Sequence, residues 1–122
     1  MDDLELAWQT YDFHTNSLYE LEEKHRSVIE YYRKFVAKNL NPSQTKKTYV
    51  RNKVNKSFNM IINAYNKQLT AIDDLIVLHN SGVDIPAERD TDPQLLYQLK
   101  NITATLVEEV KIVRRDINEV LR

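Results

Sequence analysis

One short motif in this 122-residue chain has the spacing of a metal-ligand pair. Glu22 and His25 form a Glu-x-x-His sequence, which would place both side chains on one face of a helix. Helical bundles that hold two metal ions carry two such pairs together with further inward-facing carboxylates. His14 and His79 have no glutamate three positions earlier. The sequence therefore predicts no metal site and no bound cofactor.

The sequence also offers no recognisable set of catalytic side chains. The chain contains no cysteine, so it has no thiolate nucleophile and no thiolate metal ligand. Its single glycine excludes a glycine-rich phosphate loop. Asp73 and Asp74 are adjacent, so at most one of them can face the interior of a helix pair. We therefore predict that the protein is not an enzyme.

The charged residues are arranged in blocks, although the formal net charge is −1. Residues 1–30 hold eight acidic and two basic residues, and residues 73–122 hold ten acidic and six basic residues. Residues 31–72 hold nine basic residues and no acidic one. An acid-free segment of this length, in a chain that is 29% charged, exceeds what solvation of a surface requires. This basic block is the candidate binding segment.

The basic block has the composition of a surface that binds phosphate groups. Lysine and arginine attract phosphates regardless of sequence, and asparagine amides donate to phosphate oxygens or base edges. Tyr31 and Tyr49 could stack on unpaired bases. The candidate contact residues, for the phosphate backbone of DNA or RNA or for an acidic protein partner, are Arg33, Lys34, Lys38, Lys46, Lys47, Arg51, Lys53, Lys56 and Lys67, with Asn52, Asn55 and Asn59.

Two other interpretations of the basic block remain open. Lysine and asparagine both have AT-rich codons, so an ordinary solvated helix face could have this composition. The sequence pI of about 6.3 is also well below the pI above about 9 that is typical of nucleic-acid-binding domains. Alternatively, the basic end of one molecule could meet the acidic end of the next, head to tail, or could dock an acidic partner protein.

Glycine and proline residues divide the chain into three segments. Pro42, Gly82, Pro86 and Pro93 are the only helix breakers, and the expected helices cover residues 3–39, 42–80 and 93–121 approximately.

Capping residues stand at these boundaries. Asp2 and Asn41 are the predicted N-caps of the first two helices, with Pro42 and Pro93 in first helical positions. Gly82 suits the left-handed position that follows a helix.

Apolar residues recur at helical spacing in all three segments. The expected core positions of the first helix are Leu4, Trp8, Tyr11, Leu18, Leu21, Val28, Tyr32 and Phe35. Those of the second are Val50, Val54, Phe58, Ile61, Tyr65, Leu69, Ile72 and Ile76. Those of the third are Leu99, Leu106, Val110, Val113, Ile117 and Val120, flanked by Leu95, Leu96 and Ile102. The pattern keeps its register across residues 15–17, which form helices poorly, so we expect the first helix to be continuous.

These segments predict an all-α fold, in which residues 1–122 form one domain, an elongated antiparallel three-helix bundle. Short connections make neighbouring helices antiparallel, so the basic residues of segment 31–67 are expected to meet at one end and acidic residues at the other. Three helices with one apolar stripe each barely enclose a core. We therefore expect leftover apolar surface to allow dimerisation into a larger bundle.

No apolar run approaches the ~18 residues of a membrane span, and the acidic N-terminus is unlike a signal peptide, so a cytoplasmic location is expected. We interpret the sequence as that of a non-enzymatic helical interaction or assembly module, working as a homo-oligomer or as a subunit of a larger complex. Its contact surfaces would be an apolar seam and the oppositely charged ends. The alternative is sequence-independent nucleic-acid binding through the basic end.

Overall fold

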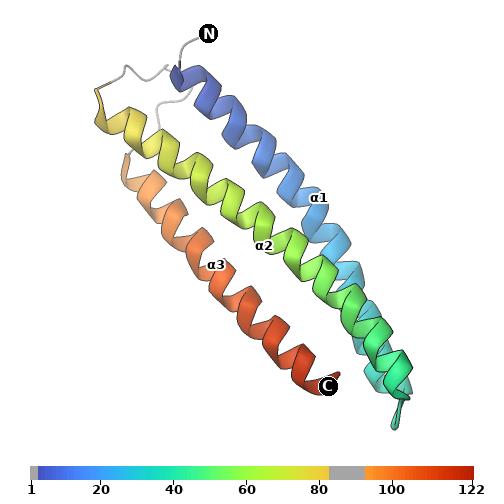
Figure 1. The fold of residues 1–122 in the computed structure, drawn as a ribbon. Coiled ribbons are helices and arrows are strands. Elements are labelled where there is room, and N and C mark those ends of the chain that lie inside the picture. The colour runs from blue at the N-terminus through green and yellow to red at the C-terminus, as the bar shows by residue number, and fades with distance from the viewer. Residues whose placement is uncertain (1–2, 83–92) are drawn as a thin grey trace.

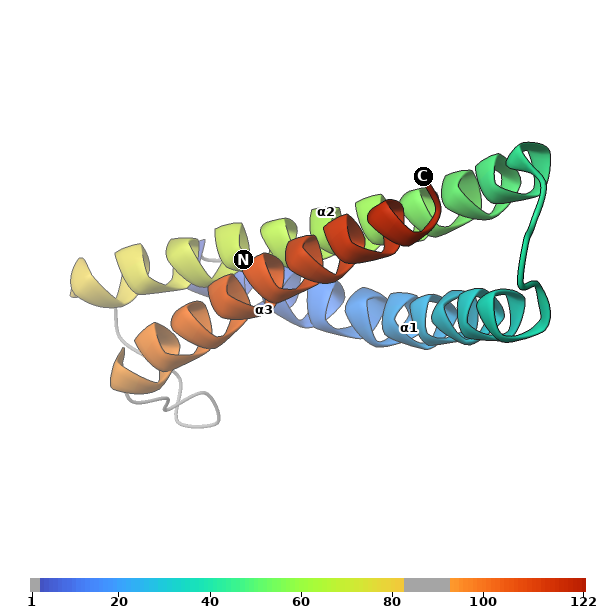
Figure 2. The same cartoon turned by 90° about the horizontal axis from the view of Figure 1, so that it is seen from below.

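The computed structural model describes residues 3–82 and 93–122, and it places three helices in these ranges. The helices are α1 (Asp3–Lys38), α2 (Gln44–Asn80) and α3 (Pro93–Val120). They run lengthwise beside one another, and a short connection, residues 39–43, joins α1 to α2 at one end (Figures 1 and 2). With 37 residues, α2 is about 55 Å long. The predicted all-α three-helix fold is confirmed.

The start of α2 differs from the prediction by two residues. Ser43 is the N-cap, because its backbone is extended (φ −66°, ψ 157°) and its Oγ accepts a hydrogen bond from the Lys46 amide at 3.2 Å. Pro42 therefore precedes the helix, and the prediction of Asn41 as the cap is wrong. The cap predicted at Asp2 lies outside the described residues.

The other helix boundaries agree with the sequence. Ser81 caps the C-terminus of α2, and Gly82 follows it with φ +80°, a conformation that glycine adopts without steric cost. α3 begins at Pro93, as predicted. α1 is continuous across residues 15–17, where Thr15 accepts a hydrogen bond from Gln68 of α2 at 2.7 Å.

α2 is the central helix of the bundle. α1 and α3 both pack on it, whereas no Cα atom of α1 approaches one of α3 within 8 Å. The burial pattern agrees, because twelve residues are buried on α2, two on α1 and four on α3. In Figure 1, α2 lies between the other two helices along most of its length. Each outer helix therefore keeps part of its surface uncovered.

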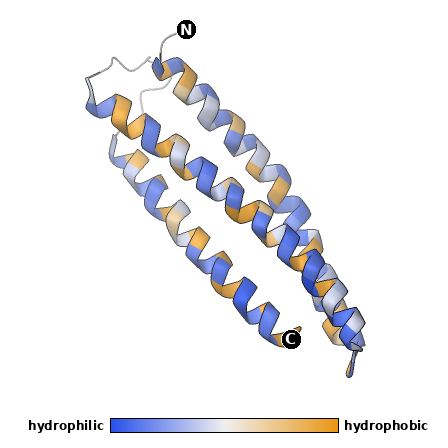
Figure 3. Cartoon of the chain, viewed as in Figure 1, coloured by the Kyte–Doolittle hydropathy of each residue, from blue (hydrophilic) through white to orange (hydrophobic). Residues whose placement is uncertain are grey.

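Buried apolar side chains form three clusters along the rod, and apolar positions recur along every helix in Figure 3. Full burial of each large aliphatic side chain contributes roughly 1.5–3 kcal/mol. The cluster nearest the N-terminus consists of Leu4, Trp8, Ile72, Leu75, Ile76 and Leu96. The middle cluster consists of Ile61, Ile62, Tyr65 and Val107. The cluster nearest the α1–α2 turn consists of Val50, Val54, Phe58, Ile117 and Leu121.

The core positions predicted for α2 are correct, since seven of the eight are buried and Leu69 is half-buried. On α1, Leu4 and Trp8 are buried, and the remaining predicted positions are half-buried because the backbone of α1 lies close to that of α2 only.

The predicted core face of α3 is partly wrong. Leu96, Thr103, Val107, Ile117 and Leu121 are buried, whereas two predicted seam residues, Val113 and Val120, are 47% and 55% exposed, and the flanking residues Leu95 and Ile102 are also exposed. Both sets recur at helical spacing, and the buried set faces α2. The exposed set lies roughly 90° around the helix from it, at 100° per residue. A single sequence pattern does not say which of two adjacent stripes meets the neighbour.

None of the helices in the described ranges is long and apolar enough to cross a membrane.

Candidate interaction surfaces

The turn between α1 and α2 brings most of the predicted basic residues together at one end of the rod. Arg33, Lys34 and Lys38 come from the last turns of α1, and residues 46–56 come from the first turns of α2. α3 ends beside them, because the Lys47 Nζ lies 3.5 Å from the Arg122 carbonyl oxygen and Leu121 packs against the α2 residue Val50. We call this region the basic end.

Lys67 does not belong to the basic end, contrary to the expectation from sequence. It lies 14 residues beyond Lys53 along α2, which is about 20 Å of helix. Its neighbours are Phe13 and His14 of α1, with which it lines a groove in the middle of the molecule. The acid-free block of sequence includes Lys67, but helix length separates it from the rest.

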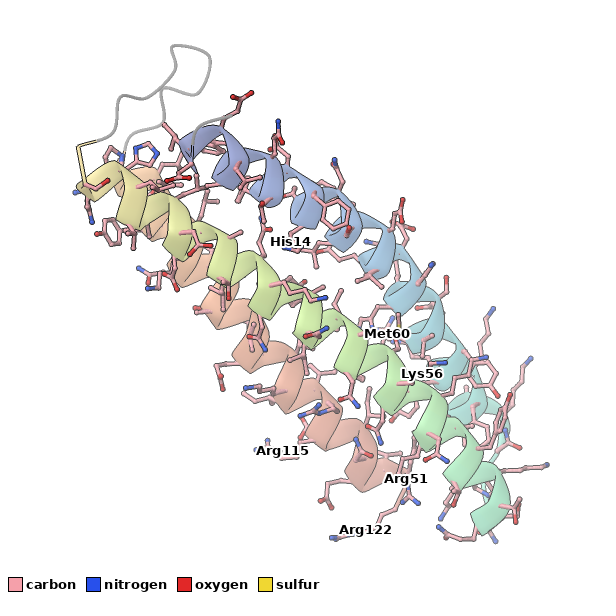
Figure 4. The ribbon with its side chains drawn as sticks, turned by 45° about the horizontal axis from the view of Figure 1, so that its top comes forward. His14, Arg51, Lys56, Met60, Arg115 and Arg122 are labelled. Atoms are coloured by element: carbon pink, nitrogen blue, oxygen red, sulfur yellow. The ribbon has the colours of Figure 1, made fainter. Side chains whose placement is uncertain are left out.

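α3 contributes cations that the candidate set did not include. Arg114 donates to Asn59 Oδ1 at 2.9 Å, and the Arg122 carbonyl oxygen lies near Lys47. Arg115 projects from the side of α3 that is away from α2 (Figure 4). Arg115 pairs with Asp116 at 3.3 Å, and Arg122 pairs with Glu119 at 3.5 Å. The expected antiparallel topology could have indicated these arginines, since it places the end of α3 beside the start of α2.

Most of the predicted cations have no carboxylate near them. Arg33 pairs with Glu30 at 2.8 Å. Within the described ranges, the other eight have no carboxylate oxygen within 4.0 Å. Lys53 instead lies over the Tyr31 ring, 4.3 Å from its centroid. The basic end is therefore a concentration of positive charge that the molecule itself leaves largely unneutralised.

Two of the three candidate asparagines form hydrogen bonds with side chains of α3. Asn55 and Asn118 exchange amide hydrogen bonds of 3.0 and 2.8 Å, and both are half-buried. Asn59 accepts from Arg114, and Asn52 remains exposed. Asn55 is therefore less accessible to a phosphate than a candidate contact residue should be, because it lies at the junction between α2 and α3.

Polar side chains also connect α1 to α2 through the middle of the rod. Tyr65 donates to Glu22 Oε1 at 3.2 Å, and Ser57 Oγ lies 2.8 Å from His25 Nδ1. Burial, together with the Glu22 charge and hydrogen bond, raises the pKa of Tyr65 to about 12. Burial lowers the pKa of His25 below its usual 6.5.

The Glu22 and His25 side chains of the Glu-x-x-His motif therefore each have a hydrogen-bond partner on α2. In the part of the chain that the structure describes, no three His, Asp or Glu side chains gather as metal ligands would.

Exposed apolar side chains form two further surfaces. One follows the open groove between α1 and α2, where Leu6, Phe13, Met60 and Val77 are between 46% and 66% exposed. The other is the exposed stripe of α3, which consists of Leu95, Ile102, Val113 and Val120. Several large apolar side chains exposed on one face are typical of sites that contact another protein.

Comparison of the chain with protein-family models, with curated proteins and with solved structures gave no match.

Proposed function

We propose that this protein is a non-enzymatic helical interaction module that works by assembling with other helical surfaces. The observation that carries the proposal is the incomplete packing of the bundle. α1 and α3 each have close backbone contact with α2 only, so both keep rows of exposed large apolar side chains. Such rows normally become buried against another helix, as in four-helix bundles and helix-in-groove complexes.

The groups with shifted pKa values support a structural role over a catalytic one. His25 and Tyr65 are the kind of perturbed residues that mark active sites when they line a cleft together with a nucleophile or a base. His25 and Tyr65 do line a surface cleft of about 460 Å³, together with Glu22 and Glu30. Each is nevertheless engaged by a side chain of the facing helix, His25 by Ser57 and Tyr65 by Glu22, and these contacts link α1 to α2. This use of buried polar groups is consistent with an assembly of helices.

Sedimentation velocity of two surface variants tests the proposal. Phe13→Gln and Ile102→Gln each remove an exposed apolar side chain from one of the two surfaces, without opening a cavity in the core. At least one variant should weaken self-association while its circular dichroism stays helical. Ala104→Gln is the matched control, because it introduces the same side chain at an exposed position of α3 without removing a large apolar one. Association unchanged in both apolar variants contradicts the proposal for self-assembly.

A second candidate function, sequence-independent binding of nucleic acid through the basic end, has its own support. Eight of the nine candidate cations have no carboxylate partner in the described ranges, and those at the basic end can therefore meet phosphates without first breaking ion pairs. Tyr31 and the exposed Tyr49 stand among them, so bases of a single strand could stack there.

Fluorescence anisotropy with labelled DNA and RNA at two salt concentrations tests this second function. Affinity should fall steeply with salt and vary little with sequence. Lys53→Glu with Lys56→Glu should abolish the binding. Lys100→Glu with Lys111→Glu makes the same change in net charge outside the basic end, on α3, and should leave most of the affinity intact. Equal affinities of the two double variants would exclude a dedicated basic end.

A further inference from the structure

The groove between α1 and α2 has an ordered sequence of side chains along its length. Its wider part near the N-terminus of α1 is lined by Leu6 and Val77 together with Asp74. The adjoining part is lined by Phe13, Leu21, Met60, Ala64 and Lys67 among others. These parts have volumes of about 360 and 320 Å³. We call this surface the α1–α2 face.

The hydrogen bond between Gln68 and Thr15 fixes which residues of the two antiparallel helices lie at the same level. Counting from it, Leu6 lies level with Val77, and Phe13 lies level with residue 70. Along the rod the α1–α2 face therefore runs from the Leu6 and Val77 pair to Asp74, then Phe13, then Lys67, and finally the Leu21 and Met60 pair.

Reversing this order exchanges Asp74 with Lys67 and one apolar pair with the other, whereas Asp3, which also lines the wider part, has no basic counterpart among the residues that line the adjoining part. An apolar pair stands at each end, Phe13 stands in the middle, and Asp74 and Lys67 lie on opposite sides of it at similar distances. A surface that is complementary to its own reverse is the requirement for a twofold symmetric dimer. We infer that the α1–α2 face binds a second copy of this chain, related by a twofold axis that crosses the face near Phe13 and makes the two copies antiparallel.

Small residues on the floor of the groove allow this approach. Ala64 and Ala71 of α2 are buried at the base of the face, where larger side chains would hold a neighbouring helix away. The exposed side chains of Phe13, Met60 and Val77 then project toward the second copy, and α1 and α2 of both copies form a four-helix arrangement.

Charge complementarity selects a second antiparallel copy over other occupants. In this arrangement Lys67 lies alongside Asp74 of the second copy, and the twofold axis repeats that contact. A parallel copy would instead place Lys67 level with Lys67 and Asp74 level with Asp74, so neither charge would meet an opposite charge of the pair. A partner helix of uniform charge would meet a like charge at one of the two positions. The antiparallel dimer also keeps the two basic ends apart, at opposite tips, where both stay accessible.

This inference rests on the proposed assembly function, and charge exchange tests it in a way that separates the two. Lys67→Asp and Asp74→Lys each replace two attractive contacts per dimer with two repulsive ones. Each variant alone should dimerise roughly tenfold more weakly than the unmodified chain. In an equimolar mixture, the heterodimer of the two variants has opposite charges at both contacts, so it should form with nearly the original affinity. The double variant Lys67→Asp/Asp74→Lys should also dimerise normally.

Light scattering and sedimentation equilibrium would measure these affinities, with Lys111→Asp on α3 as the charge-matched control and circular dichroism as the check of folding. Weak dimers of the single variants and recovery in the mixture support the inference. A dimer that resists both single changes places self-association on another surface, which overturns this inference and leaves the proposed function standing. Weakening without recovery in the mixture also overturns it. An unmodified chain that stays monomeric throughout overturns both the inference and the proposed self-assembly.

Discussion

His25 of α1 faces Ser57 of α2, with 2.8 Å between the imidazole Nδ1 and the hydroxyl oxygen. The ring also packs edge-on against Phe58, 4.5 Å between centroids. The contact is half-buried, and it joins two residues on different helices that are 32 positions apart in the sequence. A titratable group at this place links the α1–α2 packing to pH.

We predict that the bundle loses stability as the solution becomes mildly acidic. Because burial lowers the pKa of His25 below 6.5 in the fold, the unfolded chain binds the proton more readily. The contribution of His25 is therefore fully present above about pH 6.5 and is lost as pH falls toward its folded pKa. Urea unfolding of the unmodified chain and of His25→Gln, at pH 7.5 and at pH 5.5, measures this contribution to the free energy of unfolding. If both proteins lose the same free energy of unfolding between pH 7.5 and pH 5.5, groups other than His25 cause the loss.

Tyr65 should show the opposite pH dependence in alkaline solution. Its pKa is raised to about 12 in the fold, so the unfolded chain releases the phenolic proton first. The stability that Tyr65 contributes is complete below pH 10 and is lost as pH rises toward 12. In Tyr65→Phe, ultraviolet titration should lose the phenol with the high pKa, and the missing Glu22 hydrogen bond should cost about 0.5–1.5 kcal/mol at neutral pH. If the variant instead lacks a phenol that titrates near the usual pKa of about 10, the high pKa does not belong to Tyr65.

The two stripes of α3 should respond very differently to truncation. Leu96→Ala removes a fully buried side chain and should cost about 2–5 kcal/mol of unfolding free energy. Val113→Ala removes one that is 47% exposed and should cost less than about 1 kcal/mol in the monomer. Chemical denaturation at low protein concentration compares them. Similar costs would mean that the α3 face was assigned to the wrong side.

The start of α2 gives a local test of the backbone. Ser43→Ala removes the hydroxyl that caps the Lys46 amide and should destabilise the protein by about 1 kcal/mol. Asn41→Ala should change stability little, because this residue lies outside the helix. Thermal unfolding of the two variants distinguishes the observed cap from the one expected from sequence. A larger effect at Asn41 would move the helix start back to Pro42.

Sequence patterns predicted the helices well because glycine and proline act locally. Pro93 and Gly82 stand where the chain must begin or end a helix, and neither needs tertiary contacts to do so. The cap of α2 was harder to predict, because Asn41 and Ser43 are both good capping residues and they stand two positions apart. The choice depends on the backbone path through the turn.

Tertiary placement explains the errors at the candidate surfaces. α3 has two apolar stripes, and only its contact with α2 decides that Val107 is buried and Val113 is not. Asn55 is turned toward Asn118 by the same contact. Lys67 belongs to the basic block in sequence, yet helix length carries it to a different surface. The order of charged and apolar residues along the sequence does not show which side of a helix packs against its neighbour.

The exposed apolar rows of α1 and α3 exist, in our proposal, to be covered by another helical surface. Sedimentation equilibrium of the unmodified chain, over a wide range of protein concentration, tests this most directly. We expect a mass that rises from the 14.4 kDa of one chain to twice that value as concentration increases. A constant mass of one chain at every concentration would contradict the proposal.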